Sequence, residues 1–343
     1  MLQRVDPRQT KMEFAEIADT PLQVSRIAIG TWAIGGWMWG GSDERQSIET
    51  IRAAFEHGIN VVDTAPAYGF GRSEEIVGKA ISGVRSDVIV ATKVGLEWKD
   101  GKVFRNASRQ RIFKEVEDSL RRLQTDYIDI YQVHWPDPLV PIEETAEAML
   151  ALLRQGKIRA IGISNFSVPQ IEQFRRVAPV HVVQPPYNLF ERGIEADVLP
   201  FCIRERIATF TYGALCRGLL SGSMRPKTSF TGDDLRKLDP KFQPPRFEHY
   251  LAAVDALDRL ARSRYGKRVL AFAMRWVLDQ GATVALWGGR RADQLEPVDE
   301  IPGWHLDAAV KSEIDRILRD AIPDPVGPEF MAPPARVAPA MAM

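Results

Sequence analysis

The residues with the clearest chemical potential follow short apolar runs that are rich in β-branched side chains. Asp63, Lys93 and His134 each end one of three successive runs, and Tyr68 lies shortly after the first. Later runs end in further hydrogen-bonding residues, namely Ser164, Asn165, Gln184 and Tyr212. A phenol near an amine and an imidazole is typical of proton transfer to or from a substrate oxygen. The set pairs no nucleophile with an adjacent base and supplies no metal-binding triad.

The chemistry of this set follows from the residue types. Asp63 and Lys93 come from neighbouring runs, so they are predicted to pair as carboxylate and ammonium. Tyrosine ordinarily has a pKa of about 10, and a nearby ammonium lowers it. We therefore predict Tyr68 as the proton donor to a carbonyl substrate, with Lys93 tuning its pKa and Asp63 holding the lysine. His134 is expected to orient the substrate oxygen through a hydrogen bond.

The elements that must position these side chains alternate between strand-like and helix-like segments. Strands are predicted at residues 26–30, 59–63, 88–93, 127–134, 158–164, 181–184, 207–212 and 283–287. Helices are predicted at residues 44–57, 74–81, 109–123, 142–154, 169–175 and 195–205. This alternation indicates a parallel sheet with crossover helices. Eight strands, without the G-x-G-x-x-G turn of an open dinucleotide-binding sheet, favour a (β/α)₈ TIM barrel that spans residues 1–343 as one domain.

Three segments depart from a plain barrel. Residues 12–26 contain two short alternating runs around a turn, which predicts a β-hairpin that plugs the barrel floor. Residues 213–247 form a long cofactor-side loop after the seventh strand, and the stretch 223–247 is rich in Pro, Gly, Lys and Asp. That composition resists a packed core, so we expect a mobile cover. The Pro- and Ala-rich residues 323–343 are predicted to be an irregular tail.

A barrel of this kind places its active site at the carboxyl ends of its strands. Each polar residue has an ordinary explanation on its own; His134, for example, could be a core histidine that bonds the backbone. Their joint placement on successive strand ends favours a shared site. The tryptophans in or beside the strand-to-helix loops are predicted to wall the substrate pocket, namely Trp32, Trp37, Trp98 and Trp135.

Composition excludes several functional classes. The chain has 45 basic and 45 acidic residues, so its charge gives no basic footprint for nucleic acid or for an anionic membrane. Cys202 and Cys216 are too few for a disulfide framework, and their spacing fits no metal site. No apolar run reaches the roughly 18 residues of a membrane span, and the first residues lack a secretion signal. A cytoplasmic protein without a nucleic-acid or membrane partner is therefore expected.

Five sequence motifs in order resemble the aldo-keto reductase family. They read DTAPAYG (63–69), ATK (91–93), VHWP (133–136), IGISNF (161–166) and QPPYN (184–188). Three further segments are similar to the bacterial general-stress members and to the NADP-dependent glycerol dehydrogenases of acetic acid bacteria. They read GTWAIGGWMWGG (30–41), YGALCRGLL (212–220) and DPVGPEFMAPP (324–334).

This resemblance implies a catalytic tetrad of Asp63, Tyr68, Lys93 and His134 and NADP(H) as the cofactor. It implies that Ser164, Asn165 and Gln184 hold the nicotinamide carboxamide and that Tyr212 stacks on the ring. Further cofactor contacts are expected from Trp32, Leu215, Arg217, Gly218, Gly288, Arg290 and Gln294, the last three beside the adenosine 2′-phosphate. The chain departs from the family at Trp287 and Val298, where many members have Pro and Asn. The expected substrates are carbonyl compounds and small polyols.

Two other functions remain compatible with the residues. Lys93 at a barrel strand end could form a Schiff base, as in an aldolase, although a neighbouring carboxylate favours the charged amine. The fold could also serve a redox sensor that binds NADPH and a partner protein without turnover.

Overall fold

The barrel predicted from the strand pattern is present. A computed structural model describes residues 11–336. Its parallel strands form a closed barrel in the order β10-β11-β12-β3-β4-β5-β8-β9. Their bounds are β3 (Ile27–Gly30), β4 (Val61–Asp63), β5 (Ile89–Val94), β8 (Ile128–Val133), β9 (Ile158–Ser164), β10 (Val182–Gln184), β11 (Ala208–Thr211) and β12 (Val284–Gly288). Each prediction of a barrel strand is confirmed, with small shifts at the ends.

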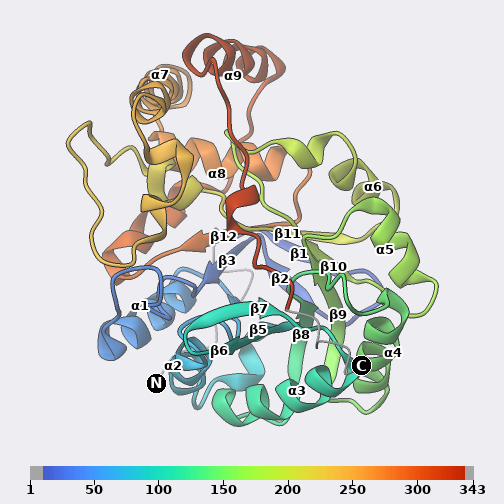
Figure 1. Cartoon of the computed structure of the whole chain (residues 1–343). Helices are drawn as coiled ribbons and strands as arrows, with labels where there is room; N and C mark the ends of the chain where they lie inside the picture. Colours follow the sequence, from blue (N-terminus) through green and yellow to red (C-terminus); the bar gives the residue numbers. More distant parts are fainter. Residues whose placement is uncertain (1–10, 337–343) are drawn as a thin grey trace, which may run out of the picture.

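Helices surround the barrel (Figure 1). They are α1 (Glu44–Glu56), α2 (Arg72–Ala80), α3 (Arg109–Leu123), α4 (Ile142–Arg154), α5 (Val168–Arg175), α6 (Val198–Arg204), α7 (Arg246–Tyr265), α8 (Val269–Asp279) and α9 (Ala308–Ala321). The sequence analysis anticipated α1 to α6 but did not identify α7, α8 or α9. Helix α8 is buried along most of its length, so it lacks the polar face that marks an amphipathic helix in sequence.

The strands carry apolar side chains on both faces because the barrel is filled inside and covered outside. Ile27 and Ile29 of β3 pack in the outer core beneath the helices, whereas Ala28 between them belongs to the inner cluster. That inner cluster includes small residues such as Ala91 and Ala160. Alternation along a strand sends neighbouring side chains to opposite faces, so each strand contributes to both cores.

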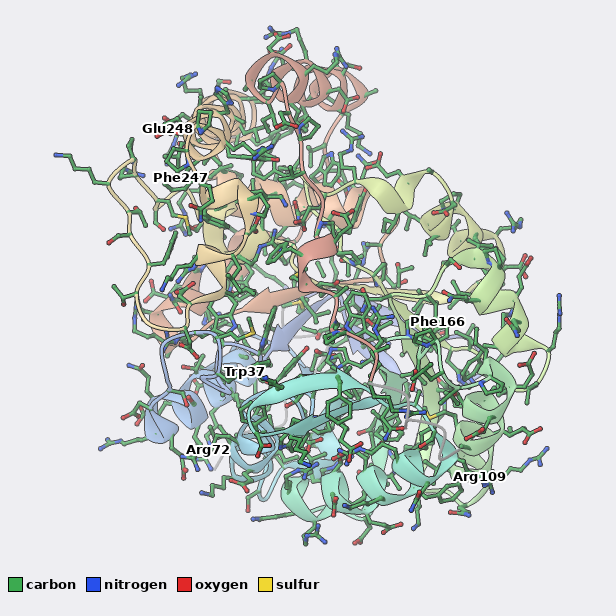
Figure 2. The ribbon with its side chains drawn as sticks, in the orientation of Figure 1. Trp37, Arg72, Arg109, Phe166, Phe247 and Glu248 are labelled. Atoms are coloured by element: carbon green, nitrogen blue, oxygen red, sulfur yellow. The ribbon has the colours of Figure 1, made fainter. Side chains whose placement is uncertain are left out.

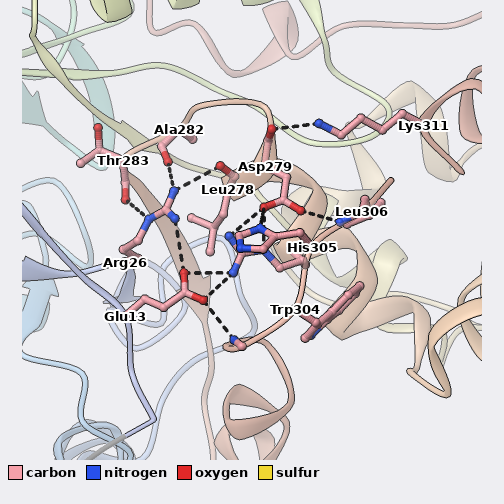
Figure 3. A network of polar contacts seen from close by, with 12 residues as sticks. Glu13, Arg26, Leu278, Asp279, Ala282, Thr283, Trp304, His305, Leu306 and Lys311 are labelled. Atoms are coloured by element: carbon pink, nitrogen blue, oxygen red, sulfur yellow. Dashed lines mark hydrogen bonds and ion pairs between the residues drawn. The ribbon is translucent and has the colours of Figure 1, made fainter. Parts of the chain in front are cut away.

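The predicted hairpin closes the floor of the barrel. Strand β1 (Phe14–Glu16) pairs antiparallel with β2 (Gln23–Ser25), and Leu22 and Val24 pack into the inner cluster. A polar network seen in Figure 3 fastens this end. In it, Glu13 accepts hydrogen bonds from Arg26 and from Arg275 of α8.

Two segments near the barrel mouth are more ordered than their sequence indicated. A second hairpin, β6 (Leu96–Lys99) and β7 (Lys102–Arg105), follows β5 and was not anticipated. The loop after β11 contains the 3₁₀ turns η4 (Leu235–Lys237) and η5 (Pro240–Phe242). Residues 235, 239, 241 and 242 of that loop are buried. The expectation that its composition would resist a packed core is therefore wrong for this part, because Asp239 and Lys241 form buried ion pairs with Arg217 and Glu191.

The tail is irregular as expected, apart from the short turn η7 (Glu329–Met331). Figure 1 shows it leaving α9 and crossing the mouth toward the β6–β7 hairpin. There Ala335 forms a parallel bridge with Arg105. The part of the predicted tail beyond residue 336 lies outside the described residues. No helix in the described part of the chain is both long and apolar enough to span a membrane.

Candidate active site

A buried ion pair lies at the carboxyl ends of two adjacent strands. Lys93 Nζ on β5 is 2.6 Å from Asp63 Oδ1 on β4 and donates a second hydrogen bond to the Thr64 carbonyl at 3.0 Å. Burial lowers the pKa of Lys93 below its ordinary value, and the charge of Asp63 opposes that shift. The predicted pairing of these two residues is confirmed.

Tyr68 lies in the loop after β4 and packs among three of the predicted site residues. Its ring is stacked on Trp32 with centroids 5.9 Å apart and meets His134 edge-on at 5.8 Å. Lys93 Nζ lies 5.0 Å from the centroid of the phenol ring. The ammonium therefore lies near the ring of Tyr68, and the imidazole borders it.

The pKa of Tyr68 differs from the expectation. Burial raises the pKa of Tyr68 well above its ordinary value, and the negative charge of Asp63 adds to the shift. The expected lowering of this pKa by Lys93 is therefore wrong for this structure, because burial disfavours the charged phenolate and the carboxylate of Asp63 adds to that effect. Burial, with a further contribution from Lys93, also holds the pKa of His134 well below 6.5. At neutral pH the site thus holds a protonated phenol beside a neutral imidazole.

The residues at the ends of β9, β10 and β11 form a connected group beside the ion pair. Ser164 Oγ donates to the Gln184 carbonyl at 2.7 Å, and Asn165 Nδ2 donates to the His134 carbonyl at 3.0 Å. The Tyr212 hydroxyl donates to Asn165 Oδ1 at 2.9 Å. The structure therefore brings together the residues that the resemblance assigned to nicotinamide binding.

Gln132 is a site residue that the sequence analysis missed. It is buried on β8, where its Nε2 donates to Asp63 Oδ2 at 3.2 Å and its Oε1 accepts from Gln184 at 3.3 Å. Gln184 Nε2 donates to the same Asp63 oxygen at 2.8 Å. A Cβ at Gly162 would lie 2.6 Å from Gln132 Cγ, so the glycine makes room for the amide. The sequence did carry a signal for this residue, because Gln132 is an amide within a mostly apolar strand, two residues before His134.

Arg290 and Gln294 lie beyond the end of β12. Gln294 Oε1 accepts from the Arg290 backbone N–H at 2.8 Å. The Arg290 side chain reaches the loop between β3 and α1 and donates to the carbonyls of Trp39 and Gly41 at 2.8 and 2.5 Å. A Cβ at Gly288 would meet nothing within 4 Å, so the end of the strand borders open space.

At the turn formed by Leu215, Arg217 and Gly218, main-chain atoms are available to a ligand, whereas the Arg217 guanidinium is not. The Arg217 guanidinium is buried and forms ion pairs with Glu191 and Asp239. Leu215 packs against the hydrophobic core. A ligand at this turn would therefore contact main-chain atoms and would not meet a free guanidinium.

The predicted tryptophans lie around the mouth, together with aromatic residues that were not singled out. Trp37 packs on Phe70 at 5.0 Å between ring centroids, and Phe70 packs on Trp98 at 5.7 Å. Arg105 lies 5.1 Å from the centroid of Trp135. Figure 2 shows Trp37 on the α1 side of the barrel mouth.

The residues present also fit an oxygen-rich cofactor. Trp39 Nε1 is buried and has no hydrogen-bond partner among residues 11–336. Its ring lies edge-on to Trp32, and the Arg236 guanidinium lies 5.3 Å from its centroid. An unpaired donor beside arginines suits ribose or phosphate oxygens. Within the same described range, no group of His, Cys, Asp or Glu side chains could hold a metal ion.

Comparison with known proteins agrees with this geometry. The pattern of the Aldo/keto reductase family matches residues 26–319. The chain is 62% identical over 328 residues to the aldo-keto reductase YhdN of Bacillus subtilis, covering 95% of this chain and 99% of that protein. Glycerol dehydrogenase AKR11B4 from Gluconobacter oxydans has a similar structure, with a TM-score of 0.85 and 52% identity over 93% of this chain and 99% of that one.

A further solved structure is the aldo/keto reductase from Klebsiella pneumoniae in complex with NADP and acetate. It is 28% identical, has a TM-score of 0.66, and the match covers 86% of this chain and 92% of that one. The family match, the identity to the Bacillus protein and the barrel fold lead to one conclusion. The chain belongs to the aldo/keto reductase family, and it is a nicotinamide-dependent oxidoreductase that acts on carbonyl or alcohol groups.

Proposed function

We propose that this chain is an NADP(H)-dependent reductase that transfers hydride reversibly between nicotinamide and small aldehydes, ketones or polyols of the glycerol and glyceraldehyde type. The observation that carries the proposal is the position of Tyr68, which contacts Trp32 and His134 with Lys93 near its ring. The polyol class is supported by the similarity to a protein named glycerol dehydrogenase.

Tyr68 acts as the general acid during carbonyl reduction and as the base in the reverse direction. A nicotinamide held at this rim would supply the hydride in reduction and take it up in the reverse direction. The Tyr68 phenol is protonated at neutral pH, since burial holds its pKa above the ordinary value, and it donates to the oxygen as negative charge develops there. The Lys93 ammonium stabilises the phenolate left behind, and Asp63 holds that ammonium in place.

His134 positions the substrate oxygen. Its pKa is depressed by burial and by Lys93, so the imidazole is neutral and one ring nitrogen carries a proton that it can donate. A neutral donor directs the oxygen toward the phenol without adding a positive charge next to Lys93. The walls formed by Trp32, Trp37, Trp98 and Trp135 exclude water from the reacting centre.

The cofactor is held by groups along the rim from β9 to β12. Ser164, Asn165 and Gln184 would hold the carboxamide, and the Tyr212 ring would pack against the nicotinamide. The turn at 215–218 meets the pyrophosphate with its backbone, and Gly288, Arg290 and Gln294 receive the 2′-phosphate. The NADP complex of the Klebsiella relative supports this choice of cofactor. A Schiff-base reaction at Lys93 is disfavoured because the pair with Asp63 stabilises the charged, non-nucleophilic amine.

The test is steady-state turnover on a small panel. Oxidation of NADPH and of NADH is followed with glyceraldehyde, other aldehydes and ketones, and reduction of NADP with glycerol and other polyols. We expect turnover of three-carbon substrates, with NADPH preferred over NADH. Tight NADPH binding with no turnover of any carbonyl would instead identify a cofactor-binding sensor. Trapping of a substrate adduct by borohydride would show an aldolase.

A further inference from the structure

Four charged side chains are buried together on the cofactor side of the barrel mouth. These residues, Glu191, Arg217, Asp239 and Lys241, are called the mouth cluster below. Arg217 Nε is 2.6 Å from Asp239 Oδ2, and Lys241 Nζ is 2.8 Å from Glu191 Oε1. Arg217 also pairs with Glu191. The two positive and two negative charges balance, so loss of one member leaves an uncompensated buried charge.

Burial opposes the charge on Glu191, yet the pKa of this carboxyl lies below its ordinary value because Arg217 and Lys241 outweigh the burial. The Glu191 carboxyl is therefore ionised at neutral pH. The members of the mouth cluster come from two loops, namely the one after β10, which carries Glu191, and the one after β11, which supplies Arg217 from its first turn and Asp239 and Lys241 from η5. The cluster connects segments that no regular secondary structure joins.

The mouth cluster holds the turn that faces the proposed cofactor. Cys216 and Arg217 have φ of +46° and +54°, which is the left-handed region that side chains other than glycine rarely adopt. Such a conformation persists only where surrounding contacts impose it. The buried ion pairs of Arg217 supply that constraint. Asn188 adds to it, since its Nδ2 donates both to Glu191 Oε2 and to the Gly213 carbonyl.

The same cluster holds the C-terminal segment. Lys241 Nζ donates to the Gly327 carbonyl at 3.0 Å. The Arg217 guanidinium lies 5.5 Å from the ring centroid of Phe330 and 3.9 Å from Met331 Sδ. From there the segment crosses the mouth, as Figure 1 shows, and the Arg105 backbone N–H donates to the Pro334 carbonyl at 2.9 Å.

We propose that the mouth cluster couples the cofactor-facing turn to the C-terminal segment, with Lys241 as the positioning residue that transmits the coupling. This inference rests on the proposed function, because it requires NADP(H) to bind at the 215–218 turn. Lys241 contacts both the carboxylate that holds Arg217 and the backbone of the segment. Coupling of this kind is reciprocal: a docked segment favours cofactor binding, and bound cofactor favours docking.

Hydrogen exchange of the full chain measures the coupling directly. Amides of residues 326–334 are followed with and without NADPH. We expect NADPH to slow their exchange at least about fivefold, the lower end of ordinary coupling between sites. Lys241→Met should abolish that slowing and weaken NADPH binding by about tenfold. Unchanged exchange on adding NADPH to the wild type would overturn the coupling, as would full protection in the variant.

Two further variants separate coupling from simple loss of stability. Arg275→Met removes a buried cation at the opposite end of the barrel, so it should lower the melting temperature yet preserve the NADPH-dependent protection of residues 326–334. If Lys241→Met does not fold, Phe330→Ala leaves all four charges in place and should reduce the protection; full protection there would count against the proposal. Failure of the wild type to bind NADPH would refute the proposed function itself, whereas binding without protection would refute only the coupling.

Discussion

Two ionic groups at opposite ends of the barrel use similar chemistry for different purposes, and all four members of the mouth cluster are buried, whereas only Arg275 of the group at the floor is. The floor group consists of Glu13, Arg26, Arg275 and Asp279, drawn in part in Figure 3. Arg26, at the start of β3, donates to the carbonyls of Leu278, Ala282 and Thr283 near the end of α8. The floor group therefore fastens helix to strand and hairpin to barrel.

The mouth cluster, in contrast, fastens loops and the C-terminal segment to one another. Its members contact a strained turn and irregular backbone, with no barrel strand among them. Floor contacts should therefore set the stability of the whole domain. Mouth contacts should set the geometry of the ligand site, because barrel enzymes build their sites from these loops. The difference shows that burial and charge alone do not reveal a group's role; what it connects does.

The sharpest test of this division is Tyr68→Phe at the mouth. It removes the group that we propose as the proton donor, so kcat should fall at least about 100-fold. The ring still packs on Trp32 and His134, so the melting temperature and the NADPH affinity should change little. Steady-state kinetics and thermal unfolding measure both. Turnover near the wild-type rate would remove Tyr68 from its proposed role.

The converse test is Arg275→Met at the floor. Its side chain is 1% exposed and pairs with Glu13 and Asp279, so the change removes one cationic partner from each of these partly buried carboxylates. Glu13 keeps its hydrogen bond from Arg26, and Asp279 keeps the one from the Leu306 backbone N–H. The free energy of unfolding should fall by about 2 kcal/mol, the ordinary cost of losing hydrogen bonds to charged groups. The kcat of the folded fraction should stay within about twofold of the wild type, since the active site lies at the other end of the barrel. A large loss of kcat in fully folded Arg275→Met protein would contradict the idea that floor contacts set stability and mouth contacts set the geometry of the ligand site.

A smaller effect is expected from Arg290→Ala. Loss of a charge-assisted contact with the 2′-phosphate should weaken NADP(H) binding about tenfold and leave NAD(H) binding nearly unchanged. Arg291→Ala is the matched control, because that neighbour pairs with Asp293 on an exposed surface. Fluorescence titration with each cofactor decides the matter. Equal weakening of NADP(H) binding and NAD(H) binding would show that Arg290 holds the loop at Trp39 in place and does not recognise the 2′-phosphate.

The smallest effect concerns the loop of residues 223–247, which we propose closes over bound NADP(H). Asp233 Oδ2 accepts from the Met38 backbone N–H at 2.8 Å, and the Leu235 N–H donates to the Met38 carbonyl at 2.9 Å, so the loop reaches the β3–α1 segment. Limited proteolysis within the loop should slow when cofactor is added. Asp233→Ala should restore rapid cleavage in its presence. Equal rates of cleavage within the loop with and without cofactor would show that the loop does not close over NADP(H).

Much of the fold and of the site was predictable because it depends on local patterns. Strand-ending residues such as Asp63, Lys93 and Gln184 could be placed on one rim once parallel strands were inferred. Helix α8 was not predictable in this way, since burial on all sides removes the periodic pattern. The β6–β7 hairpin, in contrast, was predictable and was overlooked, because a two-residue Asp100-Gly101 turn with positive φ at both positions joins its strands, which is a strong local hairpin signal.

The sequence by itself determined which groups stand at the strand ends, because side-chain alternation and parallel pairing follow from residue order. Only the tertiary structure decided the partners and protonation of those groups. Glu191 meets Lys241, and Glu13 meets Arg275, through folding that brings distant segments together. The pKa of Tyr68 rises rather than falls because desolvation in the folded mouth and the nearby carboxylate of Asp63 both disfavour the phenolate. Partner choice and burial depend on three-dimensional packing, which no local pattern encodes.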